Sequence, residues 1–376
     1  MERIAFIYGE TFVYWSSIVL TLATVCAICT FVALYLPKSR NVRACAEVIP
    51  FSMVVSLVLA RLVHWYCRTD SYSSFLSAMT DFPNGGFALM GVFAGCLFAA
   101  CFLRLMDTSE NLPEMLDCMC IAGGVGIALG RLASLFNTSA RGQIVNSVTS
   151  MPWVYPVTNA VSGVVEYRLA TFMFQAMVTA VISVVLLVLY LRGRKTGSFR
   201  DGDATLLFLL CYGASQVILD STRYDSLFFR SNGFVSIVQV LGAFGIGIPT
   251  ILFSIRLVRQ RGWKYWYLGL WALWAALMGL GGYMEYYVQR HGDRAVFSYS
   301  VMSVALVALI ALGCAIRYLA DQEPKPVAAA APEEPASEQE PEIQEPETAA
   351  QTPDEEEMLD LDVLKQTLES LDLNDL

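Results

Sequence analysis

The sequence is short of charge and almost without histidine. Only 16% of its 376 residues are charged, against about 25% in soluble globular proteins, and 56% are hydrophobic. This balance excludes an ordinary soluble domain and indicates a membrane protein, and we expect no nucleic acid partner. The two histidines, His64 and His291, offer little material for a metal cluster, so we expect neither a metal ion nor another cofactor.

Cysteine is present, and it occurs mainly where the chain is apolar. The ten cysteines are scattered along the chain, and most of them lie inside apolar segments. Free cysteine in such a setting behaves as a small hydrophobic residue, so we interpret these side chains as packing residues.

Nine apolar segments are long enough to cross a bilayer, which requires about 20 mostly apolar residues. We therefore predict an all-α polytopic membrane protein with about nine transmembrane helices. The predicted spans are residues 12–36, 44–66, 84–105, 115–136, 170–191, 204–222, 234–258, 265–288 and 296–319.

Lysine and arginine in the short loops predict the orientation, because cytoplasmic loops carry more of both. Basic residues gather after the first, fifth and seventh predicted spans, which places the N terminus outside and the C terminus in the cytoplasm. The loop after the third span is an exception, since Arg104 stands there against Asp107, Glu110 and Glu114. The loop over 137–169 is then external and long.

The C-terminal region differs in character from the rest of the chain. Residues 321–376 hold 18 acidic residues and two lysines, whereas the preceding residues carry a net charge of +7. Residues 321–352 are rich in Pro, Ala and Glu and cannot build a core, so we predict a disordered linker there. Over 353–376 leucines recur at helical spacing, which predicts a short acidic amphipathic helix.

This acidic helix has two interpretations. It is too acidic to favour an anionic membrane surface, so a cytoplasmic protein partner suits it better. A weak helix without a partner is the alternative, because short isolated helices are marginal in water.

Charged residues inside or beside the spans need a reason, because a charge at mid-bilayer costs at least about 2.5–3.5 kcal/mol. Arg61 and Arg168 suit interfacial anchors whose charged heads reach the outer surface. Arg131 lies on a glycine-rich segment and favours an anion-binding role. Asp220 and Arg223, three residues apart, share a helix face; spacing alone favours a local ion pair there, and an orienting carboxylate beside a phosphate-binding arginine is the alternative.

Several arginines that converge at one membrane face suggest a ligand that bears phosphate. Guanidinium groups match phosphate geometry and stay charged. In a membrane, the abundant ligand of this kind is a phospholipid headgroup.

Five segments, in this order, resemble motifs of the bacterial prolipoprotein diacylglyceryl transferase family. They are LARLVHWYCR, GGFALMGVFAGC, ALGRLASLFNTSARG, YRLATFMFQAM and LLCYGASQVILDSTR. The resemblance covers roughly residues 10–258, and it implies a seven-helix plasma-membrane enzyme. Enzymes of this family move the diacylglyceryl group of phosphatidylglycerol to the cysteine thiol of a prolipoprotein signal peptide.

The resemblance also implies roles for individual residues. Arg131 matches the essential arginine of the family signature, and Arg61 matches the arginine of the second helix. Asp220 stands where the family has a glutamate. Arg223 matches a following arginine, and Asn137 and Gly142 match later members of the signature motif.

The sequence also departs from the family pattern. Met90 occupies the position of the proposed histidine base, and Gln216 replaces the second phosphate-binding arginine. His64 is the candidate for a displaced base. Further replacements are Ser134, Ser139, Phe174 and Gln175.

The resemblance implies four parts: a seven-helix transferase-like core over 1–260, an additional two-helix hairpin over 261–320, and the two tail segments. We predict a diacylglyceryl transferase of the bacterial plasma membrane. The alternative is a catalytically degenerate relative that binds lipid and recruits a partner through its tail. A transporter ranks last, because no inverted repeat is apparent.

Overall fold

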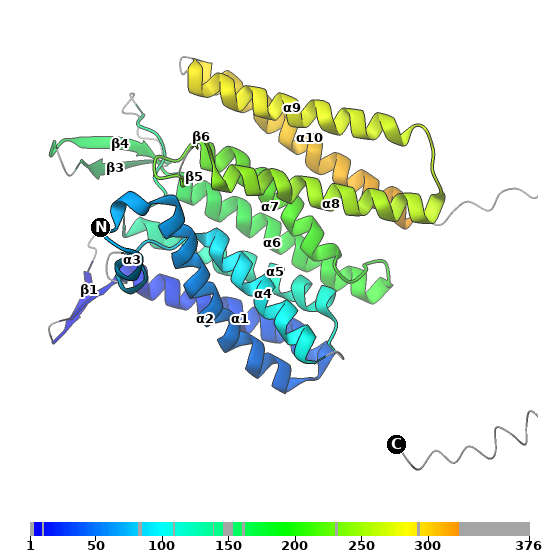
Figure 1. Cartoon of the computed structure of the whole chain (residues 1–376), viewed down its shortest axis with the longest axis horizontal. Helices are drawn as coiled ribbons and strands as arrows, with labels where there is room; N and C mark the ends of the chain where they lie inside the picture. The colour runs from blue at the N-terminus through cyan, green and yellow to red at the C-terminus, as the bar shows by residue number, and fades with distance from the viewer. Residues whose placement is uncertain are drawn as a thin grey trace, which may run out of the picture. The chain divides into compact units, whose positions relative to one another are not determined.

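Nine helices of the described residues are long and apolar enough to cross a membrane, as the sequence predicts. Figure 1 shows them as one bundle in the computed structural model. The helices are α1 (Trp15–Ser39), α2 (Val42–Cys67), α4 (Leu89–Met106), α5 (Leu112–Arg131), α6 (Thr171–Thr196), α7 (Asp203–Ser221), α8 (Ile237–Arg261), α9 (Tyr267–Arg290) and α10 (Ala295–Asp321).

The structure describes residues 4–322 except 10, 82–84, 108–109, 138, 146–152, 160–161, 230–231 and 292–293. The predicted acidic linker and the amphipathic helix at 353–376 lie outside the described residues. Residues Met1–Pro324 form a single unit. The predicted boundary at residue 260 and the orientation of the termini stay predictions.

Short elements that the helix prediction did not include gather at one end of the bundle, which we call the hairpin end (Figure 1). Each hairpin has only two strands, so the hydropathy of the sequence marks it weakly. Because the strand β2 occupies 11–14, the first helix begins at Trp15 and not at residue 12. The elements are β1 (Ile4–Tyr8), β2 (Thr11–Tyr14), α3 (Phe75–Thr80), β3 (Val154–Thr158), β4 (Val165–Leu169), β5 (Phe228–Phe229) and β6 (Asn232–Ser236), with 3-10 turns at Thr69–Ser71 and Leu132–Leu135.

Small residues bring pairs of helices into close contact, as is common between membrane helices. A Cβ added to Gly213 of α7 would lie 2.7 Å from the carbonyl oxygen of Gly242 on α8. A Cβ on Gly91 of α4 would overlap the backbone of Ala60 on α2. These glycines therefore fix how closely α7 packs on α8 and α4 on α2.

The acidic residues that follow α4 bind polar and basic side chains at the end of the bundle opposite the hairpin end. The Glu110 carboxylate accepts hydrogen bonds from Tyr35 and from Asn41, the latter at 2.7 Å. Lys38 pairs with Glu114 at 2.8 Å. Glu110 in the loop after α4 and Glu114 in the first turn of α5 thus bind polar and basic groups at the end of α1 and the start of α2.

A buried ion network at the same end joins α10 to the core. Asp203, fully buried at the start of α7, pairs with Arg256 of α8 at 2.6 Å and with Arg317 of α10 at 2.9 Å. Asp321 lies 3.6 Å from Arg317 and extends the network. The C-terminal hairpin is therefore tied to α7 and α8 through charge as well as through apolar packing.

We expect Asp203→Asn to destabilise the fold by about 3 kcal/mol, because two partly buried arginines then face a neutral amide. The measurement is the thermal unfolding midpoint of the purified protein in detergent. Glu47→Gln is the matched control, since Glu47 forms an exposed pair with Arg43, and such pairs contribute about 0.5 kcal/mol or less. Equal midpoints for the two variants would contradict a structural role for the network.

Candidate functional site

A cavity of about 90 Å³ lies at the hairpin end, between α4, α5, α7 and α8. A cavity needs roughly 10–15 Å³ to hold one water molecule, so this cavity has room for several waters or for a chemical group of similar size. Its lining combines an apolar wall with two arginines and an amide. The lining residues are Phe87, Ala88, Leu89, Met90, Arg131, Gln216, Arg223, Leu227, Ile237 and Val238.

Arg131 lines this cavity from the last position of α5. The hydroxyl of Tyr212, on α7, lies beside its guanidinium group. Among the described residues no carboxylate forms an ion pair with Arg131, so its charge stays available to a ligand. A guanidinium without an ion pair in a small cavity favours an anion, because partial removal from water strengthens the attraction between opposite charges.

Arg223 lines the cavity just after the end of α7, and two carboxylates hold it. Its Nη1 lies 3.1 Å from Asp220, and its Nε and Nη2 lie 3.0 and 2.9 Å from Asp225. A guanidinium group has five N–H donors, and these contacts use three of them. The remaining two can donate to a ligand from a fixed position.

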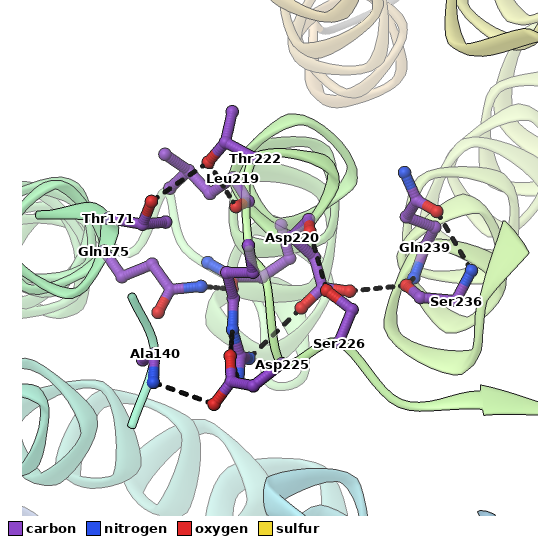
Figure 2. Close-up of polar contacts among 12 residues, drawn as sticks. Ala140, Thr171, Gln175, Leu219, Asp220, Thr222, Asp225, Ser226, Ser236 and Gln239 are labelled. Atoms are coloured by element: carbon purple, nitrogen blue, oxygen red, sulfur yellow. Dashed lines mark hydrogen bonds and ion pairs between the residues drawn. The ribbon is translucent and has the colours of Figure 1, made fainter. Parts of the chain in front are cut away.

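Asp220 connects Arg223 to the end of the β5–β6 hairpin, and Figure 2 shows its contact with Ser236. Its carboxylate is buried and accepts a hydrogen bond from the hydroxyl of Ser236. Ser236 and Gln239 form a capping box at the start of α8, in which the side chain of each accepts a hydrogen bond from the backbone N–H of the other. This motif satisfies two backbone N–H groups that the helix leaves free. Asp225 accepts a further hydrogen bond of 2.8 Å from the amide of Ala140, so the arginine is braced from both sides.

Gln216 belongs to a buried pair of amides beside the two arginines. Nε2 of Gln175, on α6, donates to Oε1 of Gln216 at 3.2 Å. Both side chains are almost fully buried, and Gln216 alone of the pair lines the cavity. The pair gives the cavity wall polarity without a further charge.

Arg61 does not line the cavity and is engaged elsewhere. Its guanidinium donates to backbone carbonyls of α3 and the following loop, which are those of Asp81 at 2.6 Å and Gly86 at 2.9 Å and those of Ala78 and Gly85. The side chain is 2% exposed. These donors hold the loop, and the roles of Arg61 as an interfacial anchor or a phosphate ligand stay predictions.

His64 also lies outside the cavity lining. Its Nδ1 is 3.1 Å from the hydroxyl of Tyr72. Its Cε1 lies against Gly86, which has φ +88°, so that a Cβ there would come within 2.8 Å of the ring. The structure therefore supports His64 as a packing partner of the loop that leads into the cavity wall, and it does not place the ring among the lining residues.

We expect Arg61→Leu to lower the thermal midpoint strongly, because several buried carbonyls lose their donor. Hydrogen bonds to charged groups contribute about 1.5–3 kcal/mol each, so a loss of at least about 2 kcal/mol is expected. Arg68→Leu, at the exposed C-cap of the same helix, is the control. An Arg61→Leu protein that keeps the wild-type midpoint but no longer binds lipid would contradict this structural role and support the phosphate-binding interpretation.

Asn137 and Gly142 shape the segment after α5 and do not line the cavity. The Asn137 side chain accepts a hydrogen bond of 2.9 Å from the amide of Ser139. A Cβ on Gly142 would come within 2.6 Å of the Thr171 hydroxyl and 3.0 Å of the Leu169 carbonyl. Gly142 also bridges to Arg223 through the backbone, so both residues position the chain around the arginines.

Arg168 braces the β3–β4 hairpin on the same side of the bundle. It pairs with Glu166 at 2.7 Å and lies 4.1 Å from the centre of the Tyr224 ring. Hydrogen bonds from Asn159 and then from Arg168 hold the pKa of Glu166 below its usual range. Arg168 is thus a structural residue of the hairpin end, and its role as an interfacial anchor stays a prediction.

Asp225, Ser236 and Tyr212 were not singled out from the sequence. Asp225 follows Arg223 by two residues, so a search for acidic neighbours of each arginine would have found it. Ser236 precedes Gln239 by three residues, which is the spacing of a capping box. Tyr212 carries no such signal, because its position beside Arg131 depends on how α5 packs against α7.

A comparison with known protein families gives a match over residues 3–255 to the prolipoprotein diacylglyceryl transferase family model. The chain belongs to this family. Members are multi-pass proteins of the bacterial plasma membrane, in agreement with the nine apolar helices, and the family activity is that of a transferase. The residues that line the cavity all fall inside the matched region.

Similar curated proteins carry one name, phosphatidylglycerol–prolipoprotein diacylglyceryl transferase. The protein of Streptococcus equi subsp. zooepidemicus strain H70 is 25% identical over 275 residues, which are 71% of this chain and 99% of that protein. The Finegoldia magna protein is 23% identical over 69% of this chain and 97% of its own length. The Streptococcus uberis protein is 29% identical over 58% of this chain and 82% of its own length.

Proposed function

We propose that this protein transfers the diacylglyceryl group of phosphatidylglycerol to the thiol of a prolipoprotein signal-peptide cysteine. The observation that carries the proposal is Arg131, a guanidinium without a carboxylate partner among the described residues, in a small cavity that Arg223 also lines. A phosphodiester headgroup bears one negative charge and several acceptor oxygens, and two fixed guanidinium groups suit it. The names of similar proteins supply the lipid and the acceptor.

The chemistry balances with the lipid and the thiol alone. The cysteine sulfur forms a bond to the glycerol carbon of the diacylglyceryl group, and the bond from that carbon to the phosphate oxygen breaks. Glycerol phosphate leaves and takes up the proton that the thiol loses. Arg131 and Arg223 stabilise the charge that develops on the phosphate, in the way that fixed donors stabilise an oxyanion.

The reaction also needs a thiolate, because the thiol is a poor nucleophile. Among the described residues that line the cavity there is no imidazole and no carboxylate, and Met90 occupies the position for which the family pattern suggests a base. In our proposal Arg131 lowers the pKa of the incoming thiol by its charge, and the departing phosphate accepts the proton.

Complementation of a strain that lacks its own transferase tests the proposal. We expect the wild-type chain to restore growth and lipoprotein maturation, and Arg131→Ala to fail at equal membrane levels. No rescue by the wild-type protein, together with retained binding of phosphatidylglycerol, would instead support a lipid-binding relative without activity. The absence of an imidazole in the cavity lining is the observation that favours this second candidate.

A further inference from the structure

Helices α9 and α10 lie beyond the family match, which ends at residue 255. They nevertheless contact the end of α7, close to Arg223. α9 carries Glu285, whose side chain is 7% exposed although the helix is mostly apolar. A buried carboxylate in a spanning helix is costly, and such residues usually serve a specific contact. The contact here is with the last turn of α7.

The contact is made through Ser221, the last residue of α7. Its hydroxyl donates to Oε1 of Glu285 at 3.0 Å and lies 3.3 Å from the hydroxyl of Tyr299 on α10. The Tyr299 hydroxyl is also 3.5 Å from the carbonyl oxygen of Ser221. Both helices of the C-terminal hairpin therefore hold the same residue.

Ser221 lies between two residues that determine where Arg223 points. Asp220 pairs with the guanidinium of Arg223, and its carbonyl accepts the backbone amide of Arg223 at 3.0 Å. On the other side, the hydroxyl of Thr222 lies 3.2 Å from that of Thr171 on α6. The turn 220–223 is thus held by α6 from one direction and by α9 and α10 from another.

We propose that the α9–α10 hairpin is a working part of the site, in which Glu285 and Tyr299 position the 220–223 turn and thereby aim Arg223 into the cavity. Glu285 and Tyr299 are positioning residues, since they act through Ser221 and line no part of the cavity themselves. The inference rests on the proposed function, because it assumes that Arg223 binds the phosphate of the lipid.

The test compares Glu285→Ala, Glu285→Gln and Ser221→Ala in the full chain. The measurements are the dissociation constant for dioctanoyl phosphatidylglycerol, the KM and kcat of transfer, and the thermal midpoint. We expect Glu285→Ala and Ser221→Ala to weaken lipid binding and raise KM about fivefold, as for members of one hydrogen-bond network. Glu285→Gln keeps an acceptor oxygen for Ser221 and is expected to restore most of the affinity.

Ser300→Ala is the matched control, because this exposed α10 hydroxyl donates to a carbonyl of its own helix, that of Val296. Wild-type lipid affinity in both Glu285→Ala and Ser221→Ala would overturn the inference. Arg131→Ala, measured in the same series, separates this outcome from failure of the proposed function. If Arg131→Ala loses lipid binding while the hairpin variants keep it, the proposed function stands and the inference fails.

If Glu285→Ala does not fold, the lipid affinity and KM of Ser221→Ala and Tyr299→Phe test the positioning role, since each of these variants removes a single hydroxyl. A lower thermal midpoint in these variants without a change in KM would show that the hairpin only stabilises α7, and it would overturn the positioning role.

Discussion

Replacement of Arg131 by alanine is expected to lower the transfer rate about 100- to 1,000-fold, the usual loss when one donor to a developing anion is removed. Arg131 has no ion pair among the described residues, so its removal leaves no buried carboxylate uncompensated. The thermal midpoint should therefore stay near that of the wild type. Activity is measured with saturating phosphatidylglycerol and a signal-peptide substrate.

Arg68→Ala is the control for this variant, because Arg68 is an exposed arginine at the same end of the bundle. Arg131→Lys keeps the charge but presents fewer donors, and we expect intermediate activity. An Arg131→Ala protein with wild-type transfer rates would remove the main support for the proposed function.

Replacement of Arg223 by alanine is expected to weaken transfer about 10- to 100-fold, since one or two charge-assisted hydrogen bonds of about 1.5–3 kcal/mol each are lost. In contrast to the change at Arg131, this change also leaves the buried Asp220 carboxylate without the positive charge of Arg223. A lower thermal midpoint should therefore accompany the loss of activity.

The double variant shows whether both arginines act on one phosphate. Residues that bind the same group are strongly non-additive, so Arg131→Ala combined with Arg223→Ala should be little worse than Arg131→Ala alone. Losses that multiply would contradict a shared ligand and would place Arg223 outside the phosphate site.

The helices could be predicted from sequence because apolar length alone determines them. Spans of about 20 apolar residues leave few alternatives in a bilayer, and all nine predicted spans correspond to helices. The two-stranded hairpins could not be predicted in this way, because each buries little apolar surface. The β5–β6 hairpin nevertheless supplies Ser236, whose hydroxyl donates to Asp220 and so helps to position Arg223.

The candidate site could be predicted only in part. The structure brings Met90, Arg131, Gln216 and Arg223 to one cavity, as their match to motifs of one family implied. The contacts of Arg61 could not be predicted, because a sequence shows an arginine in an apolar segment but not the loop carbonyls to which it donates.

Glu285 was missed for a related reason. Its importance depends on the packing of α9 beside the end of α7, and no local pattern in the sequence encodes that contact. Contacts between single polar groups that lie far apart in the sequence could therefore not be predicted.

The most direct test is transfer by the purified protein in phosphatidylglycerol nanodiscs, with a synthetic signal peptide that contains one cysteine. The account predicts that mass spectrometry shows the peptide gaining one diacylglyceryl group while glycerol phosphate is released in equal amount. For Arg131→Ala the rate of formation of both products should fall about 100- to 1,000-fold. An unmodified peptide with the wild-type protein, under conditions in which phosphatidylglycerol binds, would contradict the account.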